Sequence, residues 1–363
     1  MRDITPDEPG QENRPMPDVQ DVVRGRVPDA KPQAGPVEPA PSSPPPARRR
    51  RRRIGLLIGG AAALAALSSG ALSAFAGHTE PVPVEHQATR IEIVTDSEGV
   101  DLLSTTGNRA TIASPTLFGD NRGEVRQSFY GDTLRLQLEC RQWGCRRDFQ
   151  VAVPAGVTVS TRLTSGSLDA RDVGGSLDVR STSGSVDLQG VRGDVTVEST
   201  SGSIDVANVS GKTRLRSSSG SLEVTGAGGE VSAQSDSGSI DVEGVRGETR
   251  LRSSSGSMDV SGVDGDVTAE STSGGIEVED FRGGRLSLKS TSGSIDAQAT
   301  SELQRLRAES SSGSIDLRVP GGKTYSVMGE SGSGSLDVDV QQDVRGVPLF
   351  VRTGSGSVDI EEG

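Results

Sequence analysis

The residues best suited to chemistry are acidic side chains that recur at one place in a repeated five-residue corner. The corner reads Ser-Gly-Ser-aliphatic-acid and occurs eleven times, with Gly275 replacing the second serine once. If the copies stack, their carboxylates come to about 5 Å from one another. Calcium prefers clustered carboxylates, so the sequence predicts a cation-binding row or, alternatively, a solvated face that discourages sideways association. The candidate cation ligands are Asp187, Asp205, Glu223, Asp241, Asp259 and Glu277.

Arginines occupy a second set of repeated positions, which we expect on the opposite face. Guanidinium groups suit phosphate and carboxylate, so a cell-wall polymer such as a teichoic acid, or another surface ligand, is a candidate partner. The alternative is a set of exposed ion pairs that help to fix the register. We expect Glu198 to pair with Arg216, and Arg252 with Glu270. The predicted anionic-ligand patch consists of Arg214, Arg216, Arg250 and Arg252.

The residue types needed for catalysis are scarce. The chain of 363 residues has two histidines, His78 and His86, and both precede the repeats. A Ser-His-Asp set therefore cannot be built on the repeats, and no phosphate-binding or dinucleotide-binding motif occurs. Aromatic residues make up 2% of the chain, which disfavours a platform that stacks on sugars. We expect a protein that is not an enzyme and has no cofactor.

The two cysteines, Cys140 and Cys145, have four residues between them. We predict a disulfide across a hairpin loop that contains Trp143, because the repeats are expected in a compartment where disulfides persist. A redox role would favour Cys-x-x-Cys spacing. A zinc site lacks further ligands, since both histidines are distant in sequence.

The elements that position these side chains follow from a short period. Corner glycines are separated by 18 residues six times, and then by 19, 20, 21 and 22 residues. Such a period is typical of a solenoid in which each repeat forms one coil. After Gly238, apolar and polar residues alternate over 239–242 and again over 249–252, with a glycine-containing turn between them. The prediction is an all-β, elongated β-solenoid with about 18 residues and two short strands per coil, rather than a hexapeptide helix with aliphatic residues every six positions.

The region before the repeats divides by composition. Residues 1–47 are acidic and rich in proline, and the run Arg48–Arg53 follows them. We predict that residues 1–53 form a disordered tail. The uncharged segment Ile54–Gly77 is long enough for a transmembrane helix. Basic residues stay on the cytoplasmic side, so we expect the tail inside the cell and the repeats outside. We then expect a linker over 78–88, an irregular β region that caps the solenoid over 89–162, and the repeats over 163–363.

Two alternatives to this organisation stay open. An Ala-x-Ala pattern at 74–76 would allow cleavage near Ala76 and secretion of the repeats. The tail is either a solvated extension or a docking segment for a cytoplasmic partner. Beside a hydrophobic span, the arginine run indicates topology and contact with anionic lipid, not nucleic acid.

The repeated corners resemble the bacterial putative-adhesin repeat family, also called the toastrack β-strand repeat family of unknown function. The segment 138–159 adds to this likeness with a cysteine pair, the sequence Val-Ala-Val-Pro-Ala-Gly-Val and then the first corner. The resemblance covers about residues 89–363 and implies a membrane-anchored protein outside the cytoplasm. Related domains occur with envelope-stress signalling proteins, and no functional residues carry over.

Two functions are therefore expected from the sequence. The first is an adhesin-like or structural display rod of the cell envelope, in which many weak contacts along the solenoid add up. The alternative is a regulatory protein that senses envelope stress and signals through its cytoplasmic tail.

Overall fold

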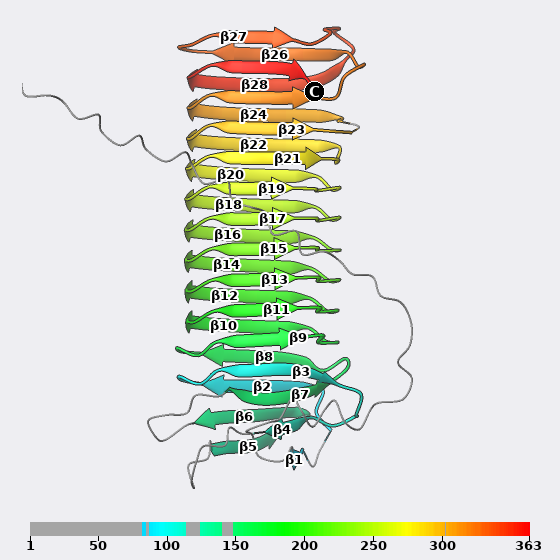
Figure 1. Cartoon of the computed structure of the whole chain (residues 1–363), viewed down its shortest axis with the longest axis vertical. Helices are drawn as coiled ribbons and strands as arrows, with labels where there is room; N and C mark the ends of the chain where they lie inside the picture. The colour runs from blue at the N-terminus through cyan, green and yellow to red at the C-terminus, as the bar shows by residue number, and fades with distance from the viewer. Residues whose placement is uncertain (1–81, 85–86, 114–123, 140–147, 302) are drawn as a thin grey trace, which may run out of the picture. The chain divides into compact units, whose positions relative to one another are not determined.

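A computed structural model describes residues 82–84, 87–113, 124–139, 148–301 and 303–363. The regular elements in these residues are all β-strands, arranged as two stacked sheets of 15 and 14 strands (Figure 1). This arrangement confirms the predicted β-solenoid. The predicted disordered tail and the predicted membrane span Ile54–Gly77 lie outside the described residues. Among the described residues, no helix has the length and apolar character needed to span a membrane.

The first sheet contains the shorter strands that follow the corner glycines. In stacking order its strands are β1 (Val82–Pro83), β4 (Thr111–Ala113), β7 (Phe149–Pro154), β3 (Val100–Thr105), β9 (Leu168–Arg171), β11 (Val186–Gln189), β13 (Ile204–Ala207), β15 (Leu222–Thr225), β17 (Ile240–Glu243), β19 (Met258–Ser261), β21 (Ile276–Phe281), β23 (Ile295–Ala299), β25 (Ile315–Val319), β29 (Val358–Glu362) and β27 (Leu336–Asp339). We call its outer surface the acidic face.

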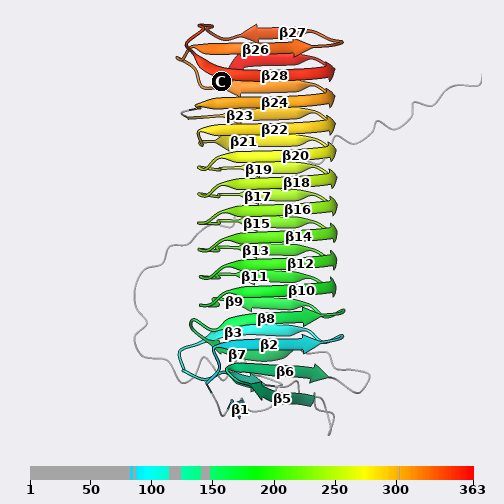
Figure 2. The same ribbon diagram turned by 180° about the vertical axis from the view of Figure 1, so that it is seen from behind.

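The second sheet contains the longer strands that lead into the corners, and it faces the viewer in Figure 2, which shows the molecule from behind. In stacking order its strands are β26 (Tyr325–Ser331), β28 (Val347–Ser355), β24 (Arg305–Ser312), β22 (Arg285–Ser292), β20 (Val267–Ser273), β18 (Thr249–Ser255), β16 (Val231–Ser237), β14 (Thr213–Ser219), β12 (Val195–Ser201), β10 (Leu177–Ser183), β8 (Thr158–Leu163), β2 (Arg90–Thr95), β6 (Thr133–Glu139) and β5 (Glu124–Tyr130). We call its outer surface the mixed face.

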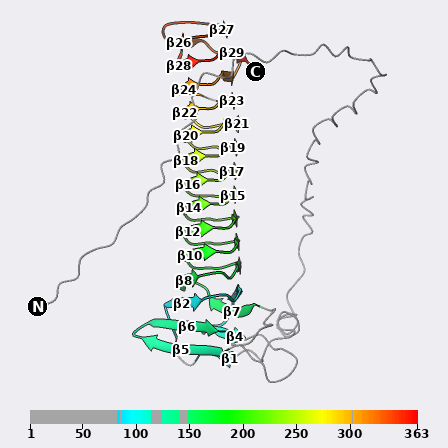
Figure 3. The same ribbon diagram turned by 90° about the vertical axis from the view of Figure 1, so that its left-hand side faces the viewer.

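One coil shows how the alternation of residue types builds the core. In β17 the side chains of Ile240 and Val242 are buried, and in β18 those of Thr249 and Leu251 are buried. Each strand pairs in parallel with strands 18 residues away, so that Ile240 lies between Leu222 and Met258. Figure 3 shows the two sheets facing each other, and the apolar side chains form continuous ladders in the core between them. This packing makes the coils interdependent, because each buries its apolar side chains against its neighbours.

The longer strand extends further than the sequence predicted. The alternation predicted a strand over 249–252, but β18 continues to Ser255 and directly reaches the corner. The side chain of Ser253 points inward and is buried. Serine at a core position looks polar in the sequence, and this is why the end of the alternation was missed.

The corner itself depends on glycine. At Gly238 the backbone φ is +140°, a value that side-chain-bearing residues rarely adopt. A Cβ atom there would lie 2.2 Å from the carbonyl oxygen of Gly220 in the preceding coil. Successive corners can therefore stack backbone on backbone only without a side chain.

The coils at both ends do not stack in sequence order. At the C-terminal end, β28 and β29 insert between the β24–β25 coil and the β26–β27 coil. At the other end, β2 and β3 lie between the β8–β9 coil and the β6–β7 coil. Inserted strands are paired on both sides, which protects them from fraying at an open edge.

Candidate binding surfaces

The acidic side chains form one uninterrupted row along the acidic face. Parallel pairing places each acidic residue directly beside the next. The row contains, in stacking order, Asp101, Asp169, Asp187, Asp205, Glu223, Asp241, Asp259, Glu277, Asp296, Asp316, Asp359 and Asp337. The structure thus brings the six predicted cation ligands together as neighbours.

Asp101 belongs to this acidic row although it precedes the first corner. It comes from β3, which inserts beside β9. A signal was present in the sequence, because Val100, Asp101 and Leu102 repeat the residues 186–188 of a regular coil. Only the stacking order shows that this copy is in contact with the row.

The electrostatics of the row oppose ionisation. Partial burial raises the pKa of Asp241 above its ordinary value, and the neighbouring carboxylates of Asp259 and Glu243 add to this effect. Burial likewise raises the pKa of Asp205, Glu223 and Asp259. None of the six candidate ligands makes an ion pair with a described residue. The row therefore keeps its negative charge at a cost to the folded state.

The spacing of the carboxylates in the row limits metal binding. Within the described ranges, no three or more histidine, cysteine or acidic side chains gather closely enough to hold a metal ion. Calcium takes six to eight oxygen ligands, whereas most coils supply one carboxylate, and β17 and β21 supply a second, Glu243 and Glu279. Cation binding by these six residues stays a prediction.

On the mixed face, the four predicted arginines fall into two pairs separated by a coil. Arg214 and Arg216 lie on β14, Arg250 and Arg252 lie on β18, and β16 comes between them. Arg250 pairs with Glu230 and with Glu248. The expected pair between Arg252 and Glu270 is present, with 3.0 Å between Nε and Oε2. The β18 pair is therefore neutralised by carboxylates.

The β14 pair differs in its partners. Arg216 donates a hydrogen bond from Nη2 to Oε1 of Gln234 over 3.2 Å, and Arg214 makes no ion pair with a described residue. The expected pair between Glu198 and Arg216 was wrong: Glu198 pairs with Arg180 on its other side, at 3.3 Å. Glu198 has an arginine on each neighbouring strand, and the sequence could not decide between them. As a result, positive charge on Arg214 and Arg216 is left without a carboxylate partner among the described residues.

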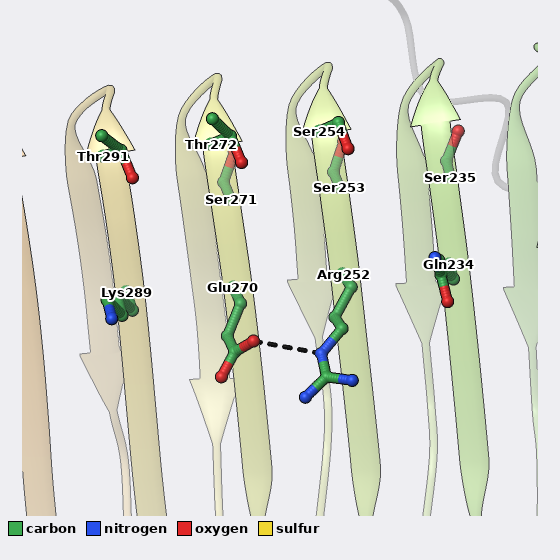
Figure 4. A pocket seen from close by; sticks show the side chains of 10 residues that line it. All are labelled: Gln234, Ser235, Arg252, Ser253, Ser254, Glu270, Ser271, Thr272, Lys289 and Thr291. Carbon is green, nitrogen blue, oxygen red and sulfur yellow. Dashed lines mark hydrogen bonds and ion pairs between the residues drawn. The ribbon is translucent and has the colours of Figure 1, made fainter. Parts of the chain in front are cut away.

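Open polar hollows lie beside these rows of charged residues. Figure 4 shows one hollow, where Arg252, Glu270 and Lys289 stand in line and the hydroxyl-bearing Ser254, Thr272 and Thr291 follow nearer the corner. A second hollow has the same construction further along the mixed face. It is lined among others by Arg162, Arg180, Glu198 and Arg216, and by Thr164, Thr182, Thr200 and Ser218. The repeat therefore produces similar polar surfaces at several places along the sheet.

Comparison with protein families identifies this repeated architecture. A family model described as Toastrack DUF4097 matches residues 148–262 and 227–361, which together make up more than half of the chain. The chain belongs to the Toastrack family. This confirms the resemblance seen in the repeated corners. A search of the curated proteins gives no match.

Two solved structures also resemble this Toastrack chain. One is described as a "putative cell adhesion protein" from Clostridium sporogenes; it is 9% identical, with 78% of this chain and 98% of that chain covered and a TM-score of 0.19. The other is described as a "putative adhesin" from Bacteroides fragilis; it is 13% identical, with 66% and 98% covered and a TM-score of 0.29.

Sequence reasoning missed a column of buried hydroxyls in the Toastrack repeats. A serine or threonine three residues before the corner glycine points into the core, as at Ser253 and Ser310. Ser310 Oγ donates to the carbonyl oxygen of Gly293 over 3.1 Å, and Thr353 Oγ1 donates to that of Gly313 over 2.9 Å. At these positions the column ties a long strand to the corner of the adjacent coil. The sequence contains a signal for this column, because a serine or threonine recurs three residues before the corner glycine from Ser181 onward.

The predicted disulfide between Cys140 and Cys145 lies outside the described residues, as do both histidines. It stays a prediction.

Proposed function

We propose that this Toastrack protein is an adhesin-like display rod of the bacterial cell envelope, anchored in the membrane through Ile54–Gly77 with its repeats outside. The observation that carries the proposal is the repetition of one polar outer surface along two continuous sheets. Such a surface offers many similar weak contacts, so avidity can exceed the strength of any one contact. Membership of the Toastrack family supports the repeated β-solenoid architecture on which the proposal depends.

The ligand class that the mixed face favours is an anionic surface polymer. Arg214 and Arg216 carry positive charge without a carboxylate partner among the described residues, and the nearby hollow is lined by hydroxyl groups that suit a hydrated polymer. Phosphate and carboxylate groups accept paired hydrogen bonds from guanidinium. The binding energy would come from repeated polar contacts, which makes it sensitive to salt.

Matched arginine variants test this proposal. The full-length chain is incubated with cell walls that contain or lack anionic polymer, and bound protein is measured at several salt concentrations. We expect R214A/R216A to weaken binding to anionic walls severalfold, and R250A/R252A to weaken it less, because acidic partners already neutralise the second pair. Equal effects of the two double variants, or equal binding to walls without anionic polymer, would contradict the proposed ligand class.

The same cells distinguish adhesion from signalling. Removal of residues 1–47 is expected to leave wall binding and the associated phenotype intact. If the phenotype disappears while binding persists, the protein acts through its tail, as the envelope-stress alternative requires.

A further inference from the structure

Exposed large hydrophobic side chains occur at the two ends of the solenoid and not along its sides. Within the described residues they are Phe129 and Tyr130 on β5, Met328 and Leu336 on β26 and β27, and Val344 just after β27. In the described residues between β8 and β25, no large hydrophobic side chain is exposed. Apolar surface confined to an end indicates an interaction surface there.

The C-terminal end is formed by two edge strands. β26 is the last strand of one sheet, and β27 is the last strand of the other. Both lie at the same end of the stack (Figure 1). The chain continues from β27 into β28 and β29, which pair with β26 and β27 on their inner side. The two edge strands are therefore connected to the stack at both ends and are not a free chain terminus. This makes β26 a preorganised edge for another strand.

The hydrogen bonds of β26 show which backbone groups face outward. Tyr325 uses its N–H and C=O on the outer side, where they bond to Gln341 and Asp343. Backbone groups alternate in direction along a strand, so Val327 and Gly329 also present N–H and C=O outward. Beyond the bridge at Tyr325, no described strand pairs with this side of β26.

The side chains of β26 suit pairing with an identical strand. In an antiparallel pair centred on Met328, Val327 of one copy would lie opposite Gly329 of the other, and these are the two residues whose backbone groups face outward. Positions 327 and 329 both face the core, so the side chain of Val327 would lie opposite a glycine, which has no side chain. Ser326 would lie opposite Glu330, which avoids like charges directly across this pair.

We propose that the C-terminal end of the solenoid binds the same end of a second copy of this chain, through antiparallel pairing of β26 with β26 about a twofold axis. The two Met328 side chains would then face each other on the mixed face. Each lies beside Phe350 of its own chain, so the pair would complete a continuous apolar strip across the junction. A twofold arrangement closes on two copies and does not propagate into a filament.

A second copy fits this surface better than the chain's own hydrophobic segment does. The described chain starts at Val82 in β1, at the other end of the first sheet. As a helix, the 24 residues of Ile54–Gly77 are about 36 Å long, and with the four residues before Val82 they extend at most about 50 Å, whereas the first sheet spans about 67 Å from β1 to β27. In its predicted helical form, the segment 54–77 therefore falls short of β26 and β27.

The contact is weak for a single pair of molecules. β27 carries Asp337 and Asp339 on its outer face, close to the same residues of the second copy, and only a short length of β26 is free to pair. If the proposed membrane anchoring holds, the C-terminal end is the tip that points away from the membrane. Self-association there would join opposing surfaces tip to tip, with strength from the number of molecules.

Charge substitutions at Met328 test the pairing. Met328 is 54% exposed, so M328K and M328E leave the core intact. Sedimentation velocity of the full-length chain, in detergent, is expected to show concentration-dependent dimers. Each variant alone should dimerise at least about fivefold more weakly, because like charges face each other. A 1:1 mixture of the two should recover dimers, because opposite charges then meet.

Tyr130→Lys is the matched control, since Tyr130 is an exposed large residue at the other end. It should dimerise as the unmodified chain does. Loss of association in Y130K would indicate head-to-tail contact and overturn the proposal, as would an M328K/M328E mixture that stays monomeric, or an unmodified chain that is monomeric throughout. Association that appears only after removal of residues 1–53 would assign the surface to the tail and overturn the proposal as well.

The proposed adhesin function and this inference can fail separately. A monomeric chain that still binds anionic walls through Arg214 and Arg216 would overturn only the self-association. A dimer that binds no wall would overturn only the proposed ligand class.

Discussion

At the residue scale, the corner glycine is the position that tolerates substitution least. In Gly238→Ala the alanine would have to adopt the unfavourable φ of +140°. Its Cβ atom would lie 2.2 Å from the carbonyl oxygen of Gly220. The backbone can relieve this contact only by separating two coils. We expect a loss of roughly 2–4 kcal/mol in the free energy of unfolding, measured by urea denaturation followed by circular dichroism.

Gly275→Ser provides the matched control. Gly275 occupies the one corner where glycine replaces the second serine. A Cβ atom at this position would have the carbonyl oxygen of Ser294 as its nearest neighbour, at 3.6 Å, which is ordinary contact. The variant should differ from the unmodified chain by less than about 0.5 kcal/mol. Similar losses in both variants would show that the corner glycines are not chosen for their geometry.

The sequence predicted inward and outward directions well wherever residue types alternate. Ile240, Val242 and Leu251 are buried as expected. It failed for Ser253, because a polar residue type predicts exposure, whereas this small side chain is buried with no hydrogen-bond partner for its hydroxyl among the described residues. It also failed for Glu198, whose two arginine neighbours are equivalent until side-chain conformations are known.

At the scale of the strands, the acidic row makes stability depend on pH in an unusual direction. Burial and neighbouring carboxylates raise the pKa of Asp205, Glu223, Asp241 and Asp259 in the folded chain. The folded state therefore binds protons more tightly than the unfolded state. This contribution is full below the unfolded-state pKa values, near about 4, and is lost as pH rises through the folded-state values.

Asp241→Asn isolates this contribution. At pH 7 the variant should have a higher urea midpoint than the unmodified chain, because it removes a charge that repels its neighbours. At a pH of about 3.5, below the unfolded-state pKa, the two midpoints should converge. Glu230→Gln should act in the opposite direction at pH 7, because hydrogen bonds and charge from Lys212 and Arg250 lower the pKa of Glu230. Destabilisation by Asp241→Asn at pH 7 would contradict the raised pKa.

The order of the end coils was beyond prediction from the period. Every coil offers the same parallel edge, so the repeats do not specify which coil lies beside which. The lengthened intervals of 21 and 22 residues between the last three corners were the available signal. The 21-residue interval contains the connection from β25 to β26, which leaves room for one coil, and the 22-residue interval contains the connection from β27 to β28, which steps back into that place. The acidic row continues through this exchange, since Asp316 pairs with Asp359 and Asp359 with Asp337.

At the scale of the whole molecule, the solenoid behaves as a one-dimensional stack in which each coil contacts mainly its two neighbours. The mid-solenoid pairs have the same register along both sheets, as in β12 with β14 and β14 with β16. A complete coil can therefore be removed without changing the register of the remaining coils, provided that both of its strands are deleted together. The inserted coils at the ends lack this property, because each is bounded by segments distant in sequence.

Deletion of residues 203–220 tests this modularity. It removes β13 and β14 and joins Gly202 to Ser221, so that β12 meets β16, with Val195 beside Val231 and Glu198 beside the neutral Gln234. We expect a folded protein that is about 4.8 Å shorter in small-angle scattering and about 1–3 kcal/mol less stable, in proportion to the residues of one coil. Deletion of residues 203–211 removes β13 and its turn while keeping β14, so β14 would follow the corner directly and fall on the wrong sheet. Because it leaves half a coil, this smaller deletion should abolish cooperative unfolding, and equal tolerance of the two deletions would contradict a stack of complete coils.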